Sequence, residues 1–105
     1  MDSGVYKFTF RENIPVKEIE ESLFWSCFNT ESIFGKARFR LDSTFYFDRH
    51  SRVVVIDKST DVGKHLAQIF ASVVAREFGD EAFRTERLLA KGFNSPAPLQ
   101  KEGER

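Results

Sequence analysis

Hydrophobic and polar positions alternate along the first part of the chain, which predicts a strand over Val5–Phe10. A period of two residues, with aromatic and β-branched side chains, is typical of a strand with one buried face. The alternation separates two sets of side chains: Tyr6, Phe8 and Phe10 on one side, and Val5, Lys7 and Thr9 on the other. The aromatic set is therefore the expected core face of this strand.

The pattern changes to a helical one after a short loop at residues 11–13. Pro15 suits a first helical position, and the glutamates of the next turns favour the start of a helix through the macrodipole. Four residues recur at helical spacing and define the expected buried stripe: Val16, Ile19, Leu23 and Cys27. We predict a helix over Pro15–Phe28, with Asn29–Glu31 as a possible interruption and Gly35 as the stop.

Alternation returns between Lys36 and Asp48, which predicts a second, longer strand with a bulge near Asp42. One side of this strand would carry Phe39, Leu41, Ser43, Phe45 and Phe47, and the other Arg38, Arg40, Asp42, Thr44 and Tyr46. The polar segment 48–51 then reads as a hairpin loop. Val53–Ile56 is apolar on both faces, as expected for a central strand.

A second helix is predicted over Asp61–Phe78. Ser59, Thr60 and Asp61 are all good N-cap residues, and Gly79 is a suitable stop. The expected inner arc of this helix contains Val62, Leu66, Ile69, Phe70, Val73 and Glu77.

The segment 83–88 admits two interpretations. Phe83, Thr85 and Arg87 alternate with Arg84, Glu86 and Leu88, which favours a fourth strand. The Glu, Arg and Leu residues are also good helix formers, so a short continuation helix is the alternative.

The order of elements is then β-α-β-β-α-β, and the fold class is α+β. Short connections and right-handed crossovers favour a ferredoxin-like sandwich, with an antiparallel sheet in the strand order 4-1-3-2 and two helices on one face. We expect one domain over residues 1–90. Residues 91–105 contain two prolines, two glycines and few apolar groups, so a flexible C-terminal tail is expected there. The expected core residues are Phe8, Phe10, Leu23, Phe45, Val54, Leu66, Ile69, Phe70 and Val73.

Composition changes this picture in two respects. Twelve phenylalanines in 105 residues supply an adequate core for so short a chain. The 16 basic side chains balance 16 acidic ones, so the basic excess typical of nucleic-acid-binding proteins is missing. A net charge of zero also mildly favours self-association.

Cys27 is the one cysteine, so an internal disulfide and a site with paired cysteines are both excluded. The sequence contains no signal peptide and no apolar stretch long enough to span a bilayer. We therefore expect a cytoplasmic protein that does not enter a membrane.

No pattern of catalytic or cofactor-binding residues stands out. The segment 58–65 resembles a phosphate-binding loop in its Gly63–Lys64 pair, but Lys58 and His65 occupy the positions that need a glycine and a hydroxyl. His50 and His65 lack further ligands at metal spacing, and Cys27 lies on a core stripe where a thiol is unreactive. We expect neither an enzyme nor a bound cofactor or metal.

The most informative feature is the outer side of the first helix. At about 100° per residue, Trp25 points away from the stripe of Ile19 and Leu23, and Phe24 and Phe28 flank it. A helix on a sheet needs only one apolar face, and Trp is enriched at interface hot spots. The sequence therefore predicts a protein-interaction module that forms a homodimer or binds another protein. The contact would be made by Phe24, Trp25 and Phe28, by the open sheet face, or by both. Packing of Trp25 within its own chain is the competing explanation.

Two other functions fit the sequence less well. The open sheet face could bind a single-stranded nucleic acid through Lys7, Arg38, Arg40 and Tyr46, although only one of these is aromatic. A regulatory domain that binds a small molecule between two protomers is the third alternative.

Overall fold

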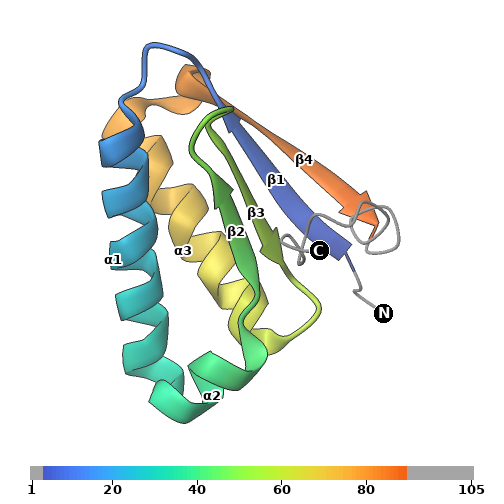
Figure 1. Cartoon of the computed structure of the whole chain (residues 1–105). Helices are drawn as coiled ribbons and strands as arrows, with labels where there is room; N and C mark the ends of the chain where they lie inside the picture. The colour runs from blue at the N-terminus through green and yellow to red at the C-terminus, as the bar shows by residue number, and fades with distance from the viewer. Residues whose placement is uncertain (1–3, 90–105) are drawn as a thin grey trace.

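The computed structural model describes residues 4–89, which form one antiparallel sheet with helices packed on one side of it (Figure 1). The strands are β1 (Gly4–Phe10), β2 (Phe45–Asp48), β3 (Val53–Asp57) and β4 (Phe83–Leu89). The helices are α1 (Val16–Phe34), α2 (Lys36–Asp42), α3 (Asp61–Phe78) and a short 3-10 turn, η1 (Asp80–Ala82). The domain boundary near residue 90 and the predicted tail 91–105 lie outside the described residues.

The strands lie in the order β2-β3-β1-β4, and every neighbouring pair is antiparallel. Read from the other edge, the order is 4-1-3-2. The segment 83–88 is thus a strand rather than a helix, because β4 pairs with β1 along its length, from Phe10 opposite Phe83 to Gly4 opposite Leu89. As a strand, this segment pairs its backbone with β1 and also packs Phe83 against the core. A continuation helix could not do both.

The core lies between the helix-facing side of the sheet and the helices. Phe8 and Phe10 of β1 face it together with Val54 and Ile56 of β3, and all four are buried. The ring of Phe70 on α3 meets Phe8 edge to face, with 5.0 Å between the centroids. The predicted inner face of the first strand is therefore confirmed.

Helix α1 is longer than predicted, because the polar segment 29–31 does not interrupt it. The buried Thr30 hydroxyl donates to the Ser26 carbonyl, and the buried Ser26 hydroxyl donates to the Ser22 carbonyl, each at 2.8 Å. These bonds give both buried hydroxyl groups a partner, so neither carries the cost of an unsatisfied buried polar group. The helix ends at Gly35, whose φ of 94° lies in the left-handed region, so the predicted stop is confirmed.

The predicted long strand over 36–48 is wrong in its first half, where residues 36–42 form α2. Lys, Ala, Arg and Leu are strong helix formers, and their preference outweighs the period-two pattern here. Phe39 packs partly against the core, while Leu41 is 82% exposed, so the alternating residues do not share one buried face. Arg38 and Asp42 form an exposed ion pair at 3.4 Å across one turn.

The second predicted helix matches α3, and both of its end signals are confirmed. The Thr60 hydroxyl accepts from the Gly63 amide at 2.9 Å and donates to the Asp42 carbonyl at 2.7 Å, which ties α3 to α2. Gly79 ends the helix with a φ of 93°.

The inner arc of α3 is rotated from the prediction. Its fully buried residues are Val62, Leu66, Phe70 and Val74, whereas Ile69 and Val73 are only half-buried and Glu77 is exposed. Phe45 was also expected in the core but remains 38% exposed, because β2 is a short strand at the edge of the sheet. Phe8, Phe10, Leu23, Val54, Leu66 and Phe70 are buried as predicted.

Candidate interaction surface

Three neighbouring aromatic side chains of α1 are largely exposed. Phe24 is 60% exposed, Trp25 58% and Phe28 54%. The Trp25 ring meets both phenylalanines edge to face, with centroid distances of 5.5 Å to Phe24 and 5.9 Å to Phe28. We call these three residues the aromatic surface. Contiguous apolar surface of this kind is typical of protein contacts.

The rotation of α1 about its axis explains why this surface points outward. The buried side of the helix contains Ile19, Ser22, Leu23, Ser26 and Thr30. Two members of the predicted stripe, Ile19 and Leu23, are buried, whereas Val16 and Cys27 are only half-buried. The buried side is thus turned toward the small serine and threonine side chains, which allow α1 to pack closely on α3. With this rotation Phe28 lies opposite the buried side, and Trp25 lies on the flank of α1 that faces α3.

A groove of about 290 Å³ lies beside Trp25, between α1 and α3. Its lining consists of Trp25, Ser22 and Val73 together with three glutamates: Glu18, Glu21 and Glu77. Sequence analysis missed the contribution of α3, because it placed Val73 and Glu77 on the buried arc. The presence of Glu77 on an otherwise apolar arc was the signal that the buried side of the helix is rotated away from it.

The other flank of α1 is tied to the β2–β3 hairpin. The guanidinium group of Arg49 donates to the Glu20 carboxylate, at 3.0 Å from Nη1 to Oε1, and lies over the Phe47 ring at 5.5 Å from its centroid. The hydrogen bond from Arg49 lowers the pKa of Glu20, and the same bond raises the pKa of Arg49. Glu20 precedes Phe24 by one helical turn, so this ion pair borders the aromatic surface.

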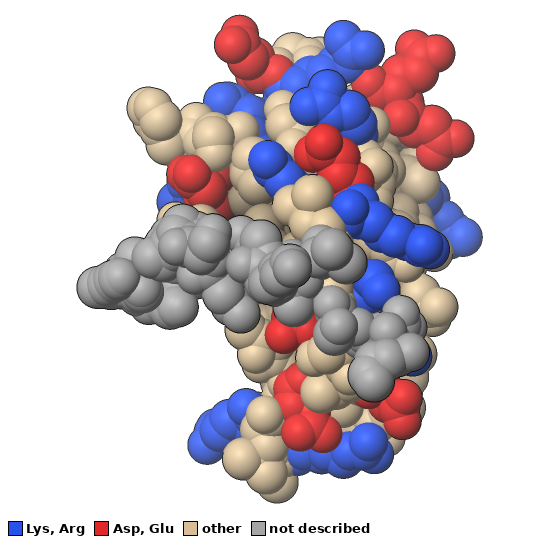
Figure 2. Space-filling model, turned by 90° about the vertical axis from the view of Figure 1, so that its right-hand side faces the viewer, with Lys and Arg blue, Asp and Glu red and all other residues tan. Residues whose placement is uncertain are grey.

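The predicted nucleic-acid face does not form as a unit. Arg38 and Arg40 lie on α2 rather than on the sheet, because residues 36–42 are helical. Lys7 and Tyr46 do lie on the open face, but Lys7 is directly opposite Glu86 in the register of β1 and β4. Figure 2 looks at the side that is turned away from the helices in Figure 1, and it shows acidic and basic side chains interspersed there. The described side chains that are visible in this view do not form the continuous basic surface that favours binding to phosphate backbones.

The other residues considered for chemistry are the cysteine, the two histidines and the glycine of the segment 58–65. Burial raises the pKa of the Cys27 thiol to about 11, so the thiol stays protonated at neutral pH and is a poor nucleophile. His50 is exposed, as predicted. His65, expected at the surface, is half-buried with its ring 5.6 Å from that of Phe34. Gly63 lies where the Asp57 carbonyl approaches the first turn of α3, which accounts for the glycine without a nucleotide.

Among residues 4–89, no group of three or more His, Cys, Asp or Glu side chains is arranged to hold a metal ion. In the same part of the chain, neither long helix has the combination of length and apolar character that crossing a membrane requires.

The chain was compared with models of known protein families and with curated protein sequences, and nothing in either set matches it.

Proposed function

We propose that this domain is a non-enzymatic protein-interaction module, and that it associates with a second copy of itself through the aromatic surface of α1. The observation that carries this proposal is the exposure of Phe24, Trp25 and Phe28 as one packed cluster. Aromatic side chains that bury each other's edges but remain more than half exposed gain most from a second protein surface.

The size of the cluster is adequate for a weak or moderate contact. Half-exposed aromatic side chains leave roughly 100 Å² each to be covered, or roughly 300 Å² per chain. At about 25 cal/mol per Å², complete burial of this area on both chains would contribute at most about 15 kcal/mol, which is comparable with the roughly 4–15 kcal/mol that association costs. Ile33, on the same helix and 58% exposed, adds to the apolar surface of α1.

The net charge of the chain is compatible with a contact between two copies. The chain carries 16 basic and 16 acidic side chains, so two copies do not repel each other through net charge. A twofold contact centred on Trp25 keeps the glutamates of the neighbouring groove at the rim, where they stay hydrated.

The arrangement of the strands supports a second proposal, that the fold is of the ferredoxin-like class. The order of the main elements is β1-α1-β2-β3-α3-β4, and α2 is then an addition between α1 and β2. The single half-buried cysteine supports the further proposal of a cytoplasmic location.

Replacing Trp25 by glutamate should weaken self-association by about 30-fold or more, the effect expected for removal of a hot-spot residue. Sedimentation equilibrium over a range of protein concentrations measures this directly. The matched control is Leu41→Glu, which introduces the same charge at a residue of α2 that is 82% exposed and lies outside the aromatic surface. This control should associate like the wild type.

Far-UV circular dichroism should show both variants folded, since neither side chain belongs to the core. A Trp25→Glu protein that unfolds would place Trp25 in the core. Equal association of Trp25→Glu and the wild type would show that α1 makes no contact between copies.

A further inference from the structure

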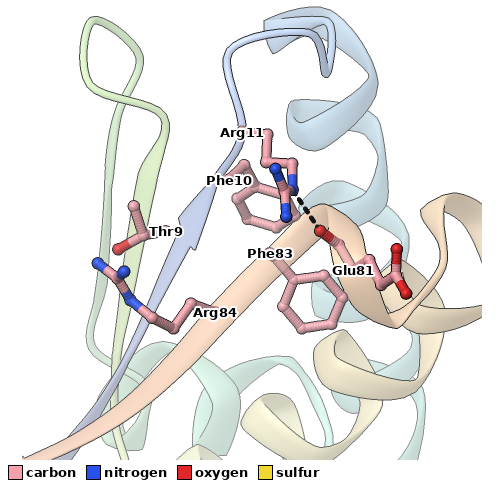
Figure 3. A pocket seen from close by; sticks show the side chains of 6 residues that line it. All are labelled: Thr9, Phe10, Arg11, Glu81, Phe83 and Arg84. Carbon is pink, nitrogen blue, oxygen red and sulfur yellow. Dashed lines mark hydrogen bonds between the residues drawn. The ribbon is translucent and has the colours of Figure 1, made fainter.

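A hollow of about 370 Å³ lies where β1 ends and β4 begins (Figure 3). Six residues line it: Thr9 and Phe10 of β1, Arg11 just after it, Glu81 of η1, and Phe83 and Arg84 of β4. The rings of Phe10 and Phe83 are 5.4 Å apart between centroids; Phe10 is buried in the core, and Phe83 packs against it while partly buried. The polar groups of the hollow are therefore next to well-packed aromatic side chains.

Two arginines line this hollow from segments that are far apart in the sequence. In Figure 3 the Arg11 side chain lies beside Glu81, whereas the Arg84 guanidinium group lies beside Thr9. Arg11 uses its Nε–H to donate to the main-chain carbonyl of Glu81, which leaves its two terminal nitrogens for other partners. Arg84 is exposed, and within residues 4–89 its side chain makes no hydrogen bond or ion pair. The Glu81 carboxylate points away from Arg84 and Thr9 (Figure 3).

Thr9 supplies the second, independent observation. Its Oγ1 atom is inaccessible to solvent and has no hydrogen-bond partner within the described part of the chain. Such a group is unfavourable until it finds a partner, and few buried polar groups lack one. Thr9 is the register partner of Arg84, and Figure 3 shows the Arg84 guanidinium group reaching back over β1 to the Thr9 side chain. A small turn of this exposed arginine would admit a ligand oxygen to the hydroxyl.

We propose that this hollow is a binding site for a phosphate group, held by the guanidinium groups of Arg11 and Arg84 and by the hydroxyl of Thr9. Guanidinium groups match the geometry of phosphate oxygens through paired N–H donors. Within residues 4–89 neither guanidinium group forms an ion pair, so the two positive charges outweigh the single negative charge of Glu81 and favour a dianionic phosphate over a singly charged carboxylate. The ligand is a phosphate ion or the phosphate group of a small molecule. The site lies on β1 and β4 and does not depend on the aromatic surface.

Inorganic phosphate is the probe, and the thermal melting temperature is the measurement. A ligand that binds the folded state alone raises the melting temperature with its concentration. We expect millimolar phosphate to raise it above the value in sodium chloride of equal ionic strength. Acetate should raise it less than phosphate does. Amide chemical shifts of Thr9 and Arg84 should move in the same titration.

Variants locate the site. Arg84→Gln should weaken phosphate binding by about tenfold, the loss expected for one charge-assisted bidentate contact. Arg87→Gln is the matched control, because Arg87 lies on the same strand but on the other face, over the Tyr6 ring at 5.8 Å. This control removes the same charge and should change the affinity by less than about twofold, since distant exposed charges are screened.

Thr9→Val separates binding from stability. Valine keeps the shape of threonine and removes the unpartnered hydroxyl, so the variant without phosphate should be at least as stable as the wild type. Its phosphate affinity should nevertheless fall several-fold. Equal losses in Arg84→Gln and Arg87→Gln would reduce the binding to a general charge effect and overturn the proposal. A melting temperature that responds equally to phosphate, acetate and chloride would also overturn it.

Discussion

Replacing Phe70 by alanine is expected to lower the free energy of unfolding by about 3–5 kcal/mol, the usual cost of emptying a buried phenylalanine site. Phe70 is fully buried at the centre of the core, and its ring meets those of Phe8 and Phe10 edge to face at 5.0 and 6.1 Å between centroids. Both phenylalanines lie on β1, which pairs with β3 and β4 and so cannot easily collapse into the cavity. Urea denaturation followed by circular dichroism measures the loss.

Ile69 provides the control, because it is the neighbour of Phe70 on α3 but is only half-buried. Ile69→Ala should cost clearly less than Phe70→Ala, since part of the isoleucine side chain remains in water in the folded state. A larger loss for Ile69→Ala would mean that α3 packs on the sheet with a different face.

Gly63→Ala is expected to destabilise the domain by about 3 kcal/mol or more, the upper part of the range for overpacking. A methyl group at this position would lie 2.0 Å from the carbonyl oxygen of Asp57, at the end of β3. The Thr60 hydroxyl, which caps α3 through the Gly63 amide, would be 3.2 Å away. Both obstacles belong to a tightly bonded turn, so the strand or the helix has to move. Denaturant unfolding again provides the measurement.

The sign of this effect discriminates between two physical terms. Alanine is favoured over glycine within a helix by about 1 kcal/mol, so helix propensity alone predicts a more stable variant. Gly79→Ala is the matched control, because a methyl group there meets nothing within 4 Å and encounters only the cost of a positive φ, about 1–2 kcal/mol. A Gly63→Ala protein as stable as the wild type would contradict the close approach of β3 to α3.

The parts of the fold that were predicted from sequence are those whose signals are local and mutually consistent. The bounds of α3 follow from the Thr60 cap and Gly79, and the inner face of β1 follows from alternation. Residues 36–42 satisfy both a strand pattern and the propensities of a helix. Packing of Phe39 against the core decides in favour of the helix, and that contact is not visible in the sequence.

The aromatic surface and the hollow between β1 and β4 also differ in how far the sequence could predict them. The outward direction of Trp25 depends on the period of one helix, so the sequence predicted its exposure. The hollow at the end of β1 joins Arg11 to Arg84, which are brought together only by the pairing of β1 with β4. Alternation does place Thr9 and Arg84 in their strands, but the register that makes them neighbours is a tertiary property.

Trp25 is the only tryptophan of the chain, so its fluorescence reports on the proposed contact without a label. The most direct measurement is its emission spectrum in a dilution series, with the molecular mass determined at each concentration by sedimentation. If α1 forms the contact between copies, the emission maximum should move to longer wavelength on dilution, at the concentration at which the mass falls to that of one chain. A monomeric mass at every concentration, with an emission maximum that stays at the long wavelength of a solvated tryptophan, would contradict self-association through the aromatic surface.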